Sequence, residues 1–364
     1  MLRQLQSWYQ RKFSDPDAGT LFLLLLGLAL LIGLFGALLA PILMAVALAY
    51  LLEWPVQSLR KFGVQRIYAV TLVFLLFVSM MLAILIFFVP VVWQQGLQLL
   101  RDMPNMLLAI QEQLIRLPEI APGFINEYQI SELIQSAKRR VLLFGELLIG
   151  QSLASLVSVM QLLIYLIVVP LLLFFMLKDR ALLLGHLSRA LPSNRRLISQ
   201  VGAEMNLQIM NYIRGKAIEV VIVGTATYLG LWAFDLQYAA LLSVLVGLSV
   251  LIPYIGAVVV TIPVFLVAFV QFGWDAELGY IMAVYLIIQA LDGNVLVPLL
   301  FSEAVDLNPV YIIAAVLVFG GLWGFWGVFF AIPLASLVKA VVTALSNQPP
   351  QAEAPSTSAA TSGN

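Results

Sequence analysis

The sequence predicts an all-α polytopic membrane protein, with about six full crossings plus two broken, re-entrant-type helical hairpins arranged as an inverted repeat. The first observation is composition: 62% of the residues are hydrophobic and 10% are charged, and the mean hydropathy is +1.01. Soluble domains carry about 25% charged residues. The second is that the apolar runs are long and continuous, which favours helices over the alternating strands of a barrel. The third is that glycine and proline interrupt the long apolar runs of the C-terminal half.

The N-terminal half contains three apolar runs. Leu21–Leu52 is too long for one upright crossing and short for two, so we expect two helices with a turn near Gly36–Pro41, the second short or tilted. A single crossing with an outside N-terminus is the alternative. Tyr68–Trp93 and Ser152–Leu177 are further spans. Between them, Gln94–Gly150 has apolar residues at helical spacing among polar ones, which predicts amphipathic helices outside the hydrocarbon.

The distribution of basic residues predicts the topology. Lys178–Lys216 is the most basic loop, and basic loops remain in the cytoplasm. Counting crossings from that loop places both termini in the cytoplasm and Gln94–Gly150 in the periplasm. The chain is therefore predicted to cross a membrane several times, with the lipid bilayer as a partner.

These assignments divide the chain into regions of different character. The tail is rich in Pro, Ser, Ala and Thr without apolar periodicity, so we expect it to be disordered. In chain order the predicted regions are a cytoplasmic N-terminus (1–20), N-terminal membrane helices (21–93), a periplasmic amphipathic region (94–150), a membrane helix (151–177), a basic cytoplasmic loop (178–216), a transport core with two hairpins (217–345) and a cytoplasmic tail (346–364).

The C-terminal half contains a weak internal repeat. The span Ala217–Phe234 is followed by the long run Tyr238–Phe272, which is broken by LIPYIGA, and the span Tyr280–Phe301 is followed by Val310–Leu345, which is broken by FGGLWGFWG. If each broken run is a hairpin, the first opens outward and the second inward. Inverted repeats with paired, interrupted segments are typical of secondary transporters. The alternative is that Gly and Pro are simply common in membrane helices.

The segment LIIQALDGNVLVPLLF places polar residues in the middle of a predicted span. A charged Asp at mid-membrane costs about 2.5–3.5 kcal/mol on insertion scales, so Asp292 should face a water-filled cavity or a partner, or be protonated. Pro298 lacks an N–H and leaves the carbonyl of Asn294 without a helical partner, and Gln289 lies one turn before Asp292. We expect a helix that opens here and presents these groups to a solute or ion. A structural hydrogen bond between helices is the alternative.

Further candidate site residues come from the hairpin tips and from the start of the span after the basic loop. The aromatic tip residues Tyr254, Trp323 and Trp326 either wall a pocket or are ordinary interfacial aromatics. Lys216 is better interpreted as a snorkelling cytoplasmic anchor. The candidate substrate-binding residues are Gln289, Asp292, Asn294, Pro298, Pro253, Tyr254, Gly256, Gly320, Gly321, Trp323, Gly324, Trp326 and Gly327, and the candidate gate residues are Asn211, Arg214 and Glu219.

Several function classes are disfavoured by what the sequence does not contain. There is no cysteine, and the one histidine, His186, lies in the basic loop, so we expect no metal site, no cofactor and no enzyme activity. There is no Walker A phosphate-binding motif. The formal net charge of zero argues against a nucleic-acid partner.

The motifs PYIGA, ALDGNVLVPLLFSEAVDLNP, FGGLWGFWGVFFAIPLA and NYIRGK resemble the autoinducer-2 exporter family of bacterial permeases. The resemblance extends from the N-terminus to about Leu345. It implies a homo-pentamer in a bacterial inner (cytoplasmic) membrane, whose protomers move solute by an elevator-like motion. It also implies hairpin roles for Pro253, Tyr254 and the tip glycines, and a broken-helix role for Asp292, Asn294 and Pro298. Many family members carry Phe or Leu where this chain has Trp323 and Trp326, so the substrate stays open.

Three functions remain as hypotheses. The first is export of a small hydrophilic solute, with an autoinducer-2-like signal as the substrate that the resemblance implies. The second is sodium (cation)/proton antiport with Asp292 as the titrating group. The third is a non-transporting membrane scaffold that uses Gln94–Gly150 to bind an envelope partner.

Overall fold

The computed structural model describes residues 16–115, 132, 135, 136, 155–190, 196–301 and 307–346. Over these ranges the chain is helical and forms no strand, which confirms the all-α membrane fold. Five described helices are long and apolar enough to cross a membrane. A sixth is added if α7 (Ser155–Lys178) and α8 (Arg180–Ala190), whose axes differ by 84°, are counted as one span.

The first helix, α2 (Pro16–Lys61), is bent at Phe35, where φ is −119° and ψ is 16°. The break falls beside the predicted turn at Gly36–Pro41. Of the two predicted alternatives for the second limb, short or tilted, the short one is wrong, since Leu38–Lys61 has 24 residues and meets the length of a span. The bend directs the two limbs to different neighbours. The second limb packs on α3 (Arg66–Ala83) and α7.

The helix α3 continues through a π-helical turn at Ile84–Phe88 into α4 (Val89–Ile115). The prediction of helix from Gln94 onward is confirmed as far as Ile115, whereas the rest of the predicted periplasmic region lies almost wholly outside the described residues. α4 packs along the C-terminal core rather than standing apart from it, because Leu99, Met106 and Ile110 contact the largest apolar cluster of the protein.

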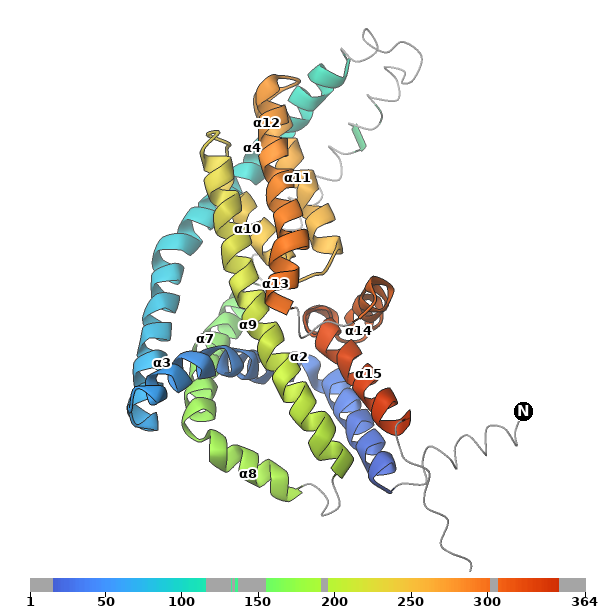
Figure 1. Cartoon of the computed structure of the whole chain (residues 1–364). Helices are drawn as coiled ribbons and strands as arrows, with labels where there is room; N and C mark the ends of the chain where they lie inside the picture. The colour runs from blue at the N-terminus through green and yellow to red at the C-terminus, as the bar shows by residue number, and fades with distance from the viewer. Residues whose placement is uncertain are drawn as a thin grey trace, which may run out of the picture.

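The segment predicted as a basic loop, Lys178–Lys216, is largely helical. It contains α8 and the first half of α9 (Arg196–Trp232), a single helix of 37 residues. Such a helix is about 55 Å long, well beyond the hydrocarbon thickness. Charged residues interrupt the apolar periodicity of this segment, and for that reason its sequence pattern predicts a loop. In Figure 1, α9 runs diagonally from the top to the bottom of the molecule, with α4, α10, α11 and α12 beside its upper half and α2, α3, α7, α8 and α15 around its lower half.

Two helical hairpins lie in the C-terminal half, as predicted. Hairpin 1 pairs α10 (Ala239–Ser249) with α11 (Ile255–Phe272), and hairpin 2 pairs α14 (Pro309–Phe329) with α15 (Ala331–Ser346). Between them in sequence lie α12 (Ala276–Leu291), a π-helical turn at Asp292–Leu296 and the short α13 (Val297–Phe301). The predicted tail lies outside the described residues.

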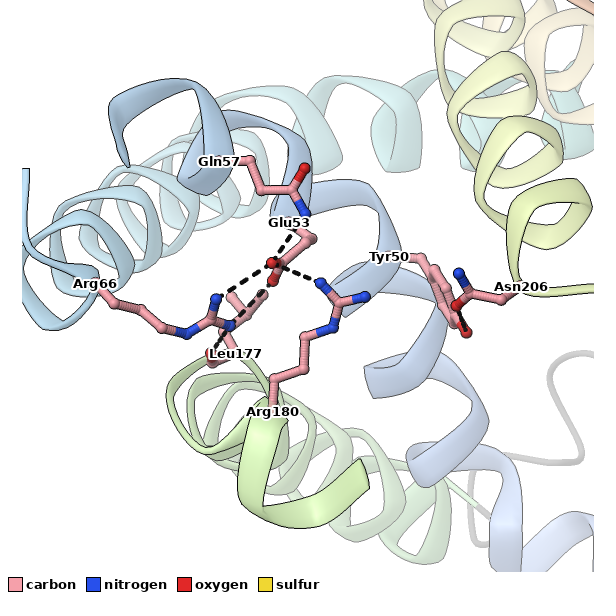
Figure 2. Close-up of polar contacts among 7 residues, drawn as sticks. All are labelled: Tyr50, Glu53, Gln57, Arg66, Leu177, Arg180 and Asn206. Carbon is pink, nitrogen blue, oxygen red and sulfur yellow. Dashed lines mark hydrogen bonds and ion pairs between the residues drawn. The ribbon is translucent and has the colours of Figure 1, made fainter. Parts of the chain in front are cut away.

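A buried carboxylate ties the lower helices together (Figure 2). Glu53 on α2 accepts hydrogen bonds from Arg66 at 3.3 Å, from Arg180 at 2.8 Å and from Gln57 at 3.2 Å. Arg66 also donates to the carbonyl of Leu177 at 2.5 Å, so one guanidinium joins α2, α3 and α7. Glu53 lies inside α2, which continues for about two further turns to Lys61.

Candidate functional site

The centre of the C-terminal half contains a cavity of 420 Å³, called here the central cavity. It lies where α9, the tip of hairpin 1, the π-helical turn and the arms of hairpin 2 meet. Most of its wall is apolar, and polar side chains enter it from two sides. Its lining residues are Lys216, Glu219, Val250, Ile252, Pro253, Tyr254, Ala257, Gln289, Asp292, Gly293, Val297, Pro298, Phe301, Leu307, Ile312 and Ile332.

Asp292 reaches the cavity because the helix is widened at that point. Pro298 cannot donate to the carbonyl of Asn294, and the chain forms a π-helical turn in which the N–H of Val297 bonds to the carbonyl of Asp292. The helix therefore bulges rather than opens, which corrects the expectation of an opened span. π-bulges are frequent at functional sites.

The carboxyl group of Asp292 is buried, and its Oδ1 has no hydrogen-bond partner. Gln289, on the same face one turn earlier, also lines the cavity and has a buried amide nitrogen without an acceptor. Asn294 does not line the cavity, because its amide donates to the carbonyl of Ala290 at 2.8 Å and the residue is exposed. Buried polar groups in proteins are normally hydrogen-bonded, so these exceptions indicate a place where a ligand or water completes the bonding.

On the opposite wall, Lys216 and Glu219 form a buried ion pair. The ammonium lies 3.1 Å from one carboxylate oxygen of Glu219 and 2.8 Å from the other. It also donates to the carbonyl of Val250 at 2.8 Å and lies 5.2 Å from the ring centre of Phe301. Gly215 permits this arrangement, since a Cβ there would meet the Phe301 ring at 2.5 Å.

Lys216 was expected to be a snorkelling cytoplasmic anchor, and that expectation is wrong. Its side chain is 5% exposed and contacts α9, α10 and α13 rather than solvent. The available signal was its spacing from Glu219, because residues three apart on a helix are neighbours. Of the predicted gate residues, Glu219 lines the central cavity, whereas Asn211 and Arg214 do not.

The tip of hairpin 1 forms the third side of the cavity. Pro253 and Tyr254 line it as predicted. Gly256 lies behind them, and a Cβ on it would collide with the carbonyl oxygen of Ser249, so only glycine lets the two arms approach this closely. Tyr254 has φ of 61°, which is unusual for a residue with a side chain and marks local strain at the tip.

Hairpin 2 has a similar construction but a different surrounding. A Cβ on Gly327 would collide with the carbonyl oxygen of Phe319, and Gly324 has φ of 58° at the turn. The ring of Trp323 stacks on Phe319 at 5.4 Å and lines an apolar pocket beside the first limb of α2 and α15. Trp326 packs among Phe325, Phe329 and Phe330 of its own hairpin.

The tip of hairpin 2 therefore lies outside the wall of the central cavity, so the structure does not bring its predicted site residues together with those of hairpin 1. Its arms contribute Ile312 and Ile332 instead. The predicted site residues outside the cavity wall are Gly256, Asn294, Gly320, Gly321, Trp323, Gly324, Trp326 and Gly327. Among the described residues, no group of three His, Cys, Asp or Glu side chains is placed to hold a metal ion.

Membrane helices, two helical hairpins and a small, partly polar cavity form a combination that is typical of membrane transport proteins. Residues 20–347 match the family model described as the AI-2E family transporter, and the chain belongs to that family. It is 52% identical over 344 residues to PerM of Escherichia coli strain K12, a candidate permease, covering 94% of this chain and 98% of that protein. It is 26% identical over 307 residues to YueF of Bacillus subtilis strain 168, a candidate transport protein, covering 82% of each.

Proposed function

We propose that this protein moves a small hydrophilic solute across the bacterial inner membrane, with the central cavity as its binding site. The observation that carries the proposal is the buried carboxylate of Asp292, whose Oδ1 has no partner at the wall of a 420 Å³ cavity. Small-molecule sites occupy about 300–1,000 Å³ and combine apolar walls with few polar groups. An unsatisfied carboxylate in a membrane protein is costly unless something binds it.

The proposed solute is hydroxyl-rich and small, and an autoinducer-2-like signal fits that chemistry. Hydroxyl groups can donate to Asp292 and accept from the amide of Gln289, and both of these cavity-lining groups have a buried atom without a hydrogen-bond partner. The family name supports this substrate class. We propose export as the direction and, following the family resemblance, a homo-pentamer as the assembly.

Cation/proton antiport is the second candidate. It is favoured by the same Oδ1, because a carboxylate that no side chain satisfies can alternate between a proton and an alkali cation. In this mechanism Asp292 carries the ion and no organic solute is needed.

The test is flux measurement with the purified full chain in vesicles of bacterial lipid. We expect movement of a labelled autoinducer-2-type furanose that is faster than in protein-free vesicles. Sodium uptake driven by a proton gradient, without furanose flux, would establish antiport instead. Absence of both fluxes from correctly assembled protein would leave the scaffold hypothesis standing and contradict the proposal.

The proposed topology has its own test. We expect both termini to be cytoplasmic and the region around Gln135 to be periplasmic. A reporter that is active only in the cytoplasm is therefore expected to be inactive when fused after Gln135, and activity there would contradict the assignment. A chain truncated after Ser346 is expected to insert and transport normally.

A further inference from the structure

The wall of the central cavity contains more carboxylates than cations. Three of its described lining residues carry a charge at neutral pH in water, namely Lys216 and Glu219 from α9 and Asp292 from the π-helical turn. Hairpin 1 adds one further titratable group, Tyr254, and hairpin 2 presents only apolar side chains. With one ammonium for two carboxylates, the cavity lacks one positive charge.

The single ammonium is committed to one of the two carboxylates. Lys216 lies 2.8 Å from Glu219 and donates to the carbonyl of Val250 at 2.8 Å. The ring of Phe301 covers it at 5.2 Å. These contacts come from α9, the tip of hairpin 1 and α13, so they hold the ammonium in place. Asp292 keeps an unpartnered oxygen, whereas both carboxylate oxygens of Glu219 lie within 3.1 Å of the ammonium.

We infer that Lys216 cancels the charge of Glu219 and thereby leaves Asp292 to set the charge selectivity of the central cavity, which accepts cationic groups or neutral hydroxyl donors at Asp292 and rejects anions. The pairing of Lys216 with Glu219 thereby determines the substrate class of the proposed transporter. The identity of a transported solute rests on the proposed function, whereas the charge preference of the cavity does not.

The physical basis is that charges interact strongly in a wall that is mostly apolar. At an effective dielectric constant of about 20, one unit charge at about 8 Å changes the equilibrium constant for binding another charge by more than tenfold. An anion entering the cavity meets Asp292 and finds no free ammonium, because Lys216 is already paired. A cation, or a hydroxyl that donates, completes the bonding of Asp292.

The natural chain contains no cysteine, so a single introduced thiol reports on the cavity. Ala257 lines the cavity and differs from cysteine by one atom, which makes Ala257→Cys the probe. Val258, the next residue, is 68% exposed and lies outside the cavity wall, which makes Val258→Cys the matched control. The full chain in detergent is treated with a cationic and an anionic methanethiosulfonate reagent. The quantity measured is the rate of modification by the cationic reagent divided by the rate of modification by the anionic one.

We expect the cationic reagent to be favoured at Ala257→Cys relative to Val258→Cys. Adding Lys216→Met to the probe should raise the ratio of the cationic to the anionic rate by more than tenfold, and adding Glu219→Gln should lower it by more than tenfold. The double change of Lys216→Met with Glu219→Gln removes the pair but keeps the net charge, so it should restore the ratio of the probe alone. The double variant also leaves no unpaired buried charge from the pair, so it provides a readout even if one of the single variants fails to fold.

Three results would overturn the inference: an anionic preference in the probe, single variants whose ratios do not move in opposite directions, or a double variant that does not return. Lys216→Arg should keep the ratio, since the charge remains. A purely structural role for the pair would reduce the amount of folded protein without reversing the ratio. Because the reagents report on the cavity whether or not flux occurs, failure of the proposed transport would be visible separately.

Discussion

Two buried carboxylates, Glu53 and Asp292, have opposite surroundings. Glu53 is 5% exposed and accepts from two arginines and a glutamine, so it is fully satisfied. Asp292 is 9% exposed and has an oxygen without a partner. Burial alone does not distinguish a structural charge from a functional one. The two kinds of carboxylate differ in hydrogen bonding. A structural carboxylate is stabilised by every donor it gains, whereas a ligand-binding carboxylate must keep one oxygen free for the ligand.

The Glu53 cluster and the central cavity also differ in what they join. Arg66 and Arg180 link Glu53 to the helices α3 and α8, and Glu53 does not line the central cavity. Lys216 links three elements around an open volume. The first arrangement fixes helices relative to one another. The second supports a site whose occupant is supplied from outside.

The largest effect is expected at Asp292. Asp292→Asn keeps the shape and removes the charge, so the initial rate of transport in vesicles should fall about a hundredfold, the equivalent of about 2.7 kcal/mol, a typical value for a hydrogen bond to a charged group. Insertion and assembly should be unchanged, because a deep charge is what costs free energy. Rates are normalised to assembled protein.

A near-normal rate for Asp292→Asn would make Asp292 a structural acceptor and remove the contrast with Glu53. Interhelical hydrogen bonds in membranes average only about 0.6 kcal/mol, so the loss of one such bond would not prevent the variant from folding and assembling.

The next effect is expected at the tip of hairpin 1, which supplies the carbonyl that holds Lys216. Gly256→Ala introduces a Cβ against the carbonyl of Ser249 and should destabilise the protein by about 1–3 kcal/mol. Gly279→Ala is the control, since a Cβ there meets nothing within 4 Å. Thermal unfolding in detergent compares the two variants. Equal melting temperatures would show that α10 and α11 can move apart without loss of stability.

At Glu53 the effect should be on stability alone. Glu53→Gln weakens the contacts to Arg66 and Arg180, whose side chains are 27% and 34% exposed, so solvent screening limits the loss to about 1–2 kcal/mol. Transport per assembled protein should stay within about twofold of the original. A large loss of transport at unchanged melting temperature would place Glu53 in the mechanism and break the comparison.

The smallest effect is expected where α4 meets hairpin 1. The hydroxyl of Tyr238 donates to Asp102 at 2.7 Å, and Tyr238→Phe should cost about 1 kcal/mol. Burial, followed by the hydrogen bond to Asp102 and the charge of Asp102, raises the pKa of Tyr238 to about 12. Since the folded pKa is above the usual value of 10, this contribution should be complete below pH 10 and disappear between pH 10 and pH 12. Unfolding measured from pH 7 to 9 should show a constant difference between the two proteins.

Local chemistry allowed part of the site to be predicted. Pro298 removes a helical donor wherever it lies, and Asp292 is costly in any apolar span, so a polar break at this point followed from the sequence. The glycines of both tips were likewise recognisable as positions of close approach. The contact between opposite walls of the cavity could not be predicted from the sequence. Lys216 and Val250 are far apart in sequence and meet only because α9 packs on α10.

Composition and periodicity alone determined that this chain is helical and lies in a membrane, because 62% hydrophobic residues in long runs leave no other way to satisfy the backbone. They also determined where the hairpins turn, since glycine and proline act within a few residues. Only the tertiary structure decided that the tip of hairpin 2 turns toward α2 and away from the cavity, and that Lys216 faces inward. Side-chain direction depends on which helices pack together, and that packing joins residues that no local pattern connects.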